Sequence, residues 1–495
     1  MLAARNLGAV MARIPTARVS VGFVLLLSAL TAIGPLTFDT YLAAFPEIAD
    51  DLNAPAAAVQ LTIAASLAGL ALGQLLFGSI SDAFGRRRPL LAALSVYVLT
   101  SVGLTLVQNI TAFTVLRFVQ GFTAAAGMVL SLAILRDRYE GIRLSKVMAR
   151  LMLVVGVAPI LAPTIGAQLL LVGSWRLIFV FLASTGAILL VVAAFTLRES
   201  LPVELRRTGG TTAALRTYRD LLTDLPFLGL ALMSAFYLSA MFTYVASSTF
   251  VFQDGYGLSP QQFGWVFAAG AVAITAGSQI NGALVGRFTP EQVLSGAVAT
   301  GLVLSLSLFA TTLLGAPFWP VTVLLVLTLG TAGFVLPSAP AIALASNPHR
   351  AGSAAALLGA LQFGLGAFIA PLTSLWGTPT AVTMAAVMAG VIVISAILLV
   401  AVRRSWARGP VAQAELAVAA AESDALVTVA AAEPNALVSV AAVESDALAT
   451  VPSVRAGVAT HAPPSPRARA AASAGPHAEA DRAPEAEPDA VPFPG

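Results

Sequence analysis

Apolar residues fill most of the chain between residues 19 and 402, in long stretches that short polar segments separate. Most of these stretches match the roughly 20 apolar residues that cross a bilayer as a helix. The two longest, 292–348 and 351–402, each hold two spans, with breaks near Gly315 and Gly377, where Gly and Pro stand together. The pattern predicts an all-α integral membrane protein with twelve transmembrane helices.

The loops between these spans alternate in charge. One set is rich in Arg and Lys, whereas the other set holds only Arg176 among several acidic residues. Basic loops face the cytoplasm in membrane proteins. We therefore expect a multi-pass protein of the cytoplasmic membrane with both termini cytoplasmic. A missed span would disturb the alternation, so the charges support the number of spans independently.

The longest loop within the membrane region divides the spans six and six. This division, with a path between two related halves, is typical of secondary transporters. A weak internal repeat agrees with it: Gly78–Arg86 follows the second span and Gly282–Arg287 follows the eighth, although the second copy lacks the Asp. The expected regions are a cytoplasmic N-terminus (1–18), two six-helix bundles (19–197 and 224–402), a linker loop between them (198–223) and a cytoplasmic tail (403–495).

The tail has low complexity and contains three tandem units of eleven residues over 418–450. An eleven-residue period suits a helical apolar stripe. However, Glu422 falls within that stripe and Pro434 interrupts the middle unit. Beyond residue 451 the composition cannot bury enough apolar surface to order the chain. We predict a disordered tail, with a docking element as the alternative.

Composition narrows the classes of function. Hydrophobic residues make up 58% and charged residues 10% of the chain, against about 25% charged in a soluble domain. The pI near 9.5 reflects membrane topology, so no nucleic acid partner is expected. The chain has no Cys and three His, all outside the spans, which argues against a metal site. It also lacks recognisable catalytic or nucleotide-binding motifs, so we expect no enzyme, no cofactor and no ATP-driven transport.

Two charged residues, Asp39 and Arg117, lie well within otherwise uncharged spans. A charge at the bilayer centre costs about 2.5–3.5 kcal/mol on insertion scales, so such residues usually face a cavity and carry function. The first and fourth spans run antiparallel, which places both charges at similar depth in the outer part of the membrane. At a separation of about 4 Å and an effective dielectric constant of about 20, they would attract each other by about 4 kcal/mol.

Burial and a neighbouring cation act in opposite directions on the proton affinity of a carboxyl group. The balance between them shifts if the cavity opens to either side, which makes Asp39, with Arg117, a candidate for proton coupling. Two alternatives remain open at this point: a static ion pair, and an Asp39 that faces the outer water from a helix end.

A loop motif follows the second span, with the residues Gly78, Asp82, Gly85 and Arg86. The first glycine permits close helix approach, the Asp is suited to capping a helix end, and the Arg run anchors the loop in the cytoplasm. An ordinary positively charged turn is the alternative interpretation.

Two spans carry further patterns. In the fourth, Arg117 and Gln120 precede small residues that allow tight helix packing. In the fifth, Pro159, Pro163 and Gly166 predict a kink or hinge, and a passive packing kink is the alternative.

These patterns resemble the major facilitator superfamily, in particular its twelve-span drug:proton antiporters and their Bcr/CflA branch. Phe38–Ala49, Phe242–Pro260 and Arg350–Phe363 are similar to further motifs of that branch. The resemblance covers residues from about 20 to 400. Ala162 and Ala167 depart from it, because the antiporter signature has Gly at both positions.

The resemblance implies the major facilitator fold and alternating access, with export of small hydrophobic or amphipathic drugs in exchange for protons. It implies a conformational gate at the Gly78–Arg86 motif and an antiporter motif at Pro163 and Gly166. The positions of three residues in spans four, seven and eleven make them candidate substrate contacts, although an interhelical hydrogen bond would suit each equally: Gln120, Tyr244 and Gln362.

The expected partners are a drug-like small molecule, protons and membrane lipid, with no obligate protein partner evident. Two alternatives remain: a metabolite exporter or importer of the same fold, and a membrane receptor or scaffold that signals through its tail.

Overall fold

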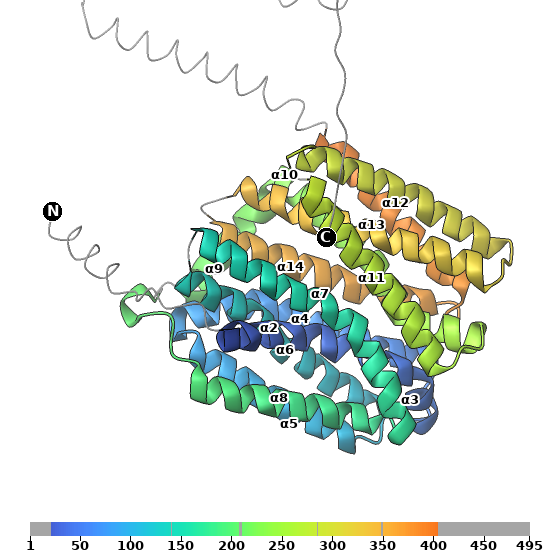
Figure 1. The fold of residues 1–495 in the computed structure, drawn as a ribbon, viewed down its shortest axis with the longest axis horizontal. Coiled ribbons are helices and arrows are strands. Elements are labelled where there is room, and N and C mark those ends of the chain that lie inside the picture. Colours follow the sequence, from blue (N-terminus) through green and yellow to red (C-terminus); the bar gives the residue numbers. More distant parts are fainter. Residues whose placement is uncertain (1–20, 140, 207–209, 285, 348–349, 404–495) are drawn as a thin grey trace, which may run out of the picture. The chain divides into compact units, whose positions relative to one another are not determined.

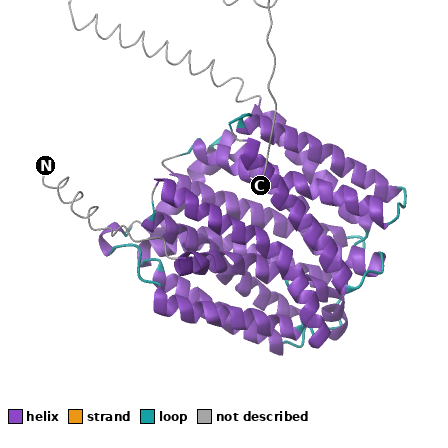
Figure 2. Cartoon of the chain, viewed as in Figure 1, coloured by secondary structure: helices purple, strands orange, loops and turns teal. Residues whose placement is uncertain are grey.

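The computed structural model describes residues 21–139, 141–206, 210–284, 286–347 and 350–403. These residues form helices joined by short connections, and no strand occurs among them (Figure 2). The expectations for residues 1–18 and for the tail lie outside the described residues, save that the last helix ends at Arg403.

Six long helices come from each half of the membrane region (Figure 1). The first half contributes α2 (Val21–Asp39), α4 (Ala56–Phe84), α5 (Arg87–Leu106), α6 (Ile110–Arg138), α7 (Gly141–Val172) and α8 (Arg176–Thr196). The second half contributes α10 (Leu225–Thr249), α11 (Pro260–Leu284), α12 (Pro290–Leu313), α13 (Phe318–Ala345), α14 (Ala351–Ile369) and the helix Ala381–Arg403.

Shorter helices link several of these. They are η1 (Leu42–Ala44), α3 (Phe45–Asp51), η2 (Val203–Leu205), α9 (Gly210–Thr223), η3 (Phe250–Gly255) and η5 (Ala370–Ser374).

In the described part of the chain, eleven helices are long and apolar enough to cross a membrane. The fifth predicted span corresponds to α7, which has the shorter apolar segment Val157–Val172. The twelve predicted spans are therefore all present as helices, and the all-α class is confirmed. Large apolar side chains such as Phe195, 87% exposed, and Trp319, 72% exposed, lie on the outside, as expected of a surface that lipid covers.

Helix ends differ from the expectation in two places. The basic segment 136–150 separates the apolar stretches predicted as the fourth span and, from residue 151, the fifth. It is helical over residues 136–138 and 141–150, because α6 runs on to Arg138 and α7 already begins at Gly141. The apolar pattern predicts a first span that runs on to about Phe45. In the structure it is not one helix: α2 ends at Asp39, and η1 and α3 continue the chain. The breaks at Gly315 and Gly377 are present, and both residues adopt positive φ values, 66° and 112°, which glycine tolerates best.

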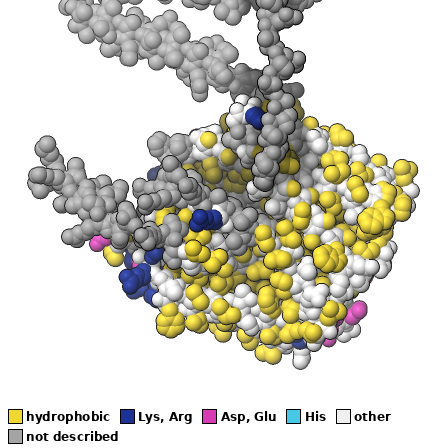
Figure 3. Space-filling view, in the orientation of Figure 1, with side chains coloured by type: hydrophobic (Ala, Val, Ile, Leu, Met, Phe, Trp, Pro, Cys, Tyr) yellow, Lys and Arg dark blue, Asp and Glu magenta, His cyan; other side chains and the backbone are white. Residues whose placement is uncertain are grey.

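The two halves meet along two helix pairs, α4 with α14 and α7 with α11. The linker between the halves contains α9, which packs on α4, α10 and α14. Tyr218 of α9 donates a hydrogen bond to the Leu75 carbonyl of α4 at 3.2 Å. On the face drawn in Figure 3, hydrophobic side chains cover the middle of the bundle and most Lys and Arg gather toward the end that holds α9.

Hydrogen bonds join the halves at the opposite end, which the charge distribution predicts to face outside. Thr249 donates to the Leu42 carbonyl at 2.9 Å, and Gln253 donates to the Ala43 carbonyl at 3.2 Å. The Gln60 amide of α4 donates to the Ala246 carbonyl of α10 at 2.9 Å. We call these three donors and their partners the outer seam. The seam closes this end in the conformation described here.

Candidate functional site

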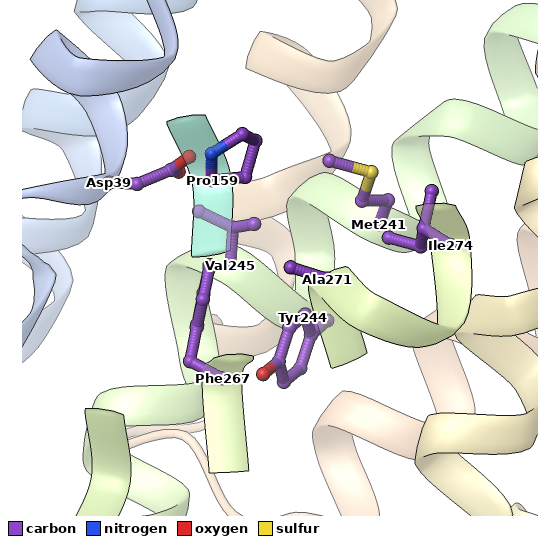
Figure 4. Close-up of a pocket in the computed structure, with 8 residues that line it drawn as sticks. All are labelled: Asp39, Pro159, Met241, Tyr244, Val245, Phe267, Ala271 and Ile274. Carbon is purple, nitrogen blue, oxygen red and sulfur yellow. The ribbon is translucent and has the colours of Figure 1, made fainter. Parts of the chain in front are cut away.

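A small cavity lies where helices of the two halves meet (Figure 4). It offers about 20 Å³ to the centres of water molecules, enough for about one water. Apart from one carboxyl and one hydroxyl group, its walls are apolar. The lining residues are Asp39 of α2, Pro159 of α7, Met241, Tyr244 and Val245 of α10, and Phe267, Ala271 and Ile274 of α11.

Asp39 is the last residue of α2 and is 7% exposed. Among the described residues, none donates a hydrogen bond to its carboxyl and no cation lies within 4.0 Å. The Tyr244 hydroxyl in the same cavity is also buried without a partner, and its ring stacks on Phe267 at 5.3 Å. An ionised carboxylate without a partner is costly to bury. The cavity therefore favours a proton or a ligand on Asp39.

Arg117 of α6 is fully buried on the other side of the same helix end. Its Nη1 donates to the Thr37 carbonyl at 3.1 Å and to Gln120 Oε1 at 2.6 Å. Its guanidinium carbon stands 4.0 Å from the centre of the Tyr41 ring, within the range of a cation–π interaction. Nε and Nη2 have no hydrogen-bond partner in the described part of the chain. The guanidinium is thus held by one carbonyl, one amide and one aromatic face.

The expected ion pair between Asp39 and Arg117 is not formed in this structure, since their charged atoms are more than 4.0 Å apart. The expectation of similar depth holds: Arg117 contacts residues 37 and 41, which flank Asp39 in the chain. The difference is one of direction. Asp39 faces α10 and α11 across the cavity, whereas Arg117 stays within the first half. The structure therefore does not show the static ion pair that sequence left open.

The three candidate substrate contacts fall in different places. Tyr244 lines the cavity. Gln120 is fully buried and donates to Ser101 of α5 at 2.7 Å while accepting from Arg117. Gln362 donates to Ser234 of α10 at 3.2 Å. For both glutamines the structure shows the interhelical hydrogen bond, and neither lines the cavity described above.

The antiporter motif of the fifth span lies where α7 touches both halves. A Cβ atom on Gly166 would overlap the Thr40 carbonyl, so glycine is required for this approach of α7 to the end of α2. Gln261 of α11 donates to the Ala167 carbonyl at 3.2 Å. Pro163 has no N–H to offer the carbonyl of Pro159, the residue that lines the cavity. The motif therefore adjoins the Asp39 cavity.

The loop motif forms a compact cluster of charges at the α9 end of the bundle. The Arg86 guanidinium donates to Asp82 and Ser81, both at 2.6 Å, and to Asp137 at 3.1 Å. Gly85 has a φ of 88°, which allows the sharp turn from α4 into α5. No atom of the described residues lies within 4 Å of a Cβ placed on Gly78, so the expected close helix approach is not seen there in this conformation.

Sequence reasoning did not single out Glu199, which completes this cluster from the linker. Its carboxylate accepts hydrogen bonds from the backbone N–H groups of Arg86 at 2.7 Å and Arg87 at 3.2 Å. Burial acts to raise the pKa of Glu199, but the N–H groups of Arg86, Leu201 and Arg87 and the charge of Arg206 outweigh it and lower the pKa. The only sequence signal is an isolated acid beside Arg198 at the end of a span.

Comparison with known proteins adds a family relationship. Residues 25–371 match the model of the Major Facilitator Superfamily. The chain is 41% identical over 376 residues to the "Uncharacterized MFS-type transporter YdgK" of Bacillus subtilis (strain 168), with 76% of this chain and 93% of that protein covered. It is 33% identical over 373 residues to a "Bicyclomycin resistance protein homolog" of Haemophilus influenzae, with 75% and 94% covered.

Among solved structures, the nucleoside transporter NupG is similar in fold. The TM-score is 0.59 at 18% sequence identity, over 77% of this chain and 98% of that chain. At this identity the likeness concerns the fold alone.

Proposed function

This chain belongs to the major facilitator superfamily, and on that premise we propose that it exports small hydrophobic or amphipathic drugs across the cytoplasmic membrane in exchange for protons. Family membership makes it a multi-pass membrane transporter rather than an enzyme. The name of the Haemophilus relative, which refers to bicyclomycin resistance, supports drugs as the substrate class.

One observation carries the proposal of proton coupling: the Asp39 carboxyl is buried, has no partner among the described residues and faces a cavity between the two halves. A buried carboxyl group needs either a proton or a favourable ligand. If a proton and a polar group of the drug compete for Asp39, occupancy by one releases the other. That exchange is the basis of antiport.

Antiport also requires alternating access. The outer seam closes one end, and opening it requires the loss of the hydrogen bonds from Gln60, Thr249 and Gln253. We propose that the cluster of Gly78, Asp82, Gly85 and Arg86 acts as a conformational gate at the opposite end. Its support is that the Arg86 side chain ties the α4–α5 turn to the end of α6.

The test is drug transport in proteoliposomes that contain the purified full chain, driven by a pH gradient. Wild-type protein should accumulate drug against its gradient, and a protonophore should abolish that accumulation. Asp39→Asn should insert normally and lose gradient-driven transport, because Asn keeps the shape of Asp and cannot titrate. Asp39→Glu, which keeps the carboxyl, is the matched control and should retain part of the transport. Undiminished pH-driven transport by Asp39→Asn would overturn the coupling role.

A further inference from the structure

Tyr41 occupies the place that a carboxylate counterion of Arg117 would be expected to take. The guanidinium lies 4.0 Å from the Tyr41 ring centre and 5.9 Å from that of Phe179. Aromatic faces attract cations most strongly where water is excluded, and Arg117 and Tyr41 are both completely buried. The ring is therefore a main partner of this charge.

The surroundings of Tyr41 hold its ring in place. Its hydroxyl is 3.0 Å from the Thr62 hydroxyl of α4. The ring also contacts Phe45, Phe113 and Phe179, with centroids 5.1, 6.4 and 6.0 Å away. A ring enclosed in this way is a fixed platform rather than an adjustable contact.

The position of this platform relative to Asp39 is informative. Arg117 binds the carbonyl of residue 37 and the ring of residue 41, so it contacts residues on both sides of Asp39 in the chain. No described residue bonds to two of its nitrogen atoms, Nε and Nη2, and a carboxylate would satisfy both. The guanidinium nevertheless stays on the side of the turn where the ring lies.

We propose that Tyr41 is a positioning residue for proton coupling: its ring holds the Arg117 guanidinium away from Asp39, so that Asp39 exchanges protons without a fixed counterion. The proposal rests on the proposed function in taking Asp39 as the coupling group. It requires that the guanidinium can cross the end of α2 to Asp39 once the ring is removed.

Few other ionisable groups face Asp39. The cavity presents only the Tyr244 hydroxyl from α10, and α7 after residue 150 and all of α11 contain no ionisable residue. Arg117 is the one ionisable residue of α6 near this end, and Tyr41 lies just after α2. Of the other helices near α2, α8 carries only Arg176, which pairs with Asp51 at 2.7 Å, and the Tyr97 hydroxyl of α5 lies 2.7 Å from the Thr37 hydroxyl. A change in the titration of Asp39 after substitution of Tyr41 therefore reports on Arg117.

The test follows the infrared carbonyl band of the protonated Asp39 carboxyl in the purified full chain, assigned by its loss in Asp39→Asn. In Tyr41→Leu, the midpoint of the band's titration should move by about 1–3 pH units toward acid, the effect of an opposite charge within a few ångströms. Tyr41→Phe keeps the ring and loses the hydroxyl, with its contacts to Thr62 and Arg117. Because the aromatic face remains against the guanidinium, its midpoint should stay near that of the wild type.

Tyr41→Met provides a second ring-free variant, because its side chain fills much of the same space without an aromatic face. It should shift the midpoint in the same direction, and it replaces Tyr41→Leu in the test if that variant does not fold. A wild-type midpoint in the folded ring-free variant, or an equal shift in Tyr41→Phe, would overturn the positioning role.

The same proteins assayed for drug–proton exchange separate this inference from the function on which it rests. If the band shifts in Tyr41→Leu but the wild-type chain exchanges no drug for protons, the positioning role stands and the proposed function fails. If the wild-type chain does exchange drug for protons but the band does not move in Tyr41→Leu, the proposed function stands and the positioning role fails.

Discussion

Gln60→Ala should open the outer seam. In the structure the Gln60 amide donates to the Ala246 carbonyl at 2.9 Å, and its oxygen accepts a hydrogen bond from Ser374. Gln60 belongs to the first half, and both partners belong to the second. Gln60 is 1% exposed, so water does not replace the bonds in the closed state. The substitution removes interactions that exist only while this end is closed.

The loss in stability of the closed state can be worked out from these two bonds. A buried hydrogen bond contributes about 0.5–1.5 kcal/mol net, so the closed state loses about 1–3 kcal/mol relative to the open state. A change of that size lowers the ratio of closed to open molecules by about 5- to 150-fold. The weaker contacts of Gln60 with Ser247 and Thr373, both at 3.4 Å, are left out of this range.

The chain contains no cysteine, which allows a direct assay. Val245 lines the cavity and is 2% exposed. Val245→Cys introduces a single thiol that a membrane-impermeant maleimide, added from outside, reaches only when the seam opens. Adding Gln60→Ala should raise the labelling rate by the factor above.

Gln362→Ala is the matched control. It also removes a buried glutamine amide, but its partner Ser234 lies in the same half, so labelling from outside should not change. Labelling of the Gln60 variant at the rate of its parent, or an equal increase in the Gln362 variant, would refute the reasoning.

Three further predictions concern the α9 end of the bundle and the tail. Asp82→Asn weakens the hold on Arg86 and should slow turnover in proteoliposomes without changing equilibrium drug binding; a collapse of binding with turnover preserved would contradict a gate. Glu199→Gln should lower the thermal unfolding midpoint of the detergent-solubilised protein at neutral pH. Folding lowers the pKa of Glu199 from 4.5, so its contribution to stability is complete above that pH and is lost as the pH falls through the folded-state pKa. The difference in unfolding midpoint between variant and wild type should therefore shrink in acid. A difference that is the same at all pH values would argue against this. Truncation after Arg408 keeps the basic residues that follow the last helix and should leave efflux near normal; an abundant, inserted protein that no longer exports would show that the repeats dock on the bundle.

Most of the fold could be predicted from the sequence because a bilayer leaves few choices. Backbone polar groups must bond within the segment that crosses it, so each long apolar stretch had to become a helix. The boundaries were less predictable. The helix α7 begins at Gly141, ten residues before the expected span, because charged residues such as Arg150 lie on a helix as readily as in a loop outside the membrane.

The sequence predicted which residues belong to the site, but not which of them contact each other. Asp39 and Arg117 stood out because charge is rare in these spans, and the structure does bring them to the same turn. Their separation depends on which way each side chain points from the end of α2. That direction is decided by the Tyr41 ring and by the packing of Gly166 against Thr40, contacts between helices that hydropathy does not encode.

The separation of Asp39 from Arg117 also affects how proton uptake is coupled to transport. An ion pair stabilised by about 4 kcal/mol would demand a proton concentration roughly a thousandfold higher to protonate the carboxyl, since each 1.36 kcal/mol corresponds to about one pH unit. A carboxyl locked in that pair would stay ionised at the proton concentrations of most cells. With the guanidinium held against an aromatic ring, the positive charge remains in the first half while Asp39 stays free to take up a proton or a ligand from the cavity. The antiport cycle proposed here therefore depends on a contact that keeps two opposite charges apart.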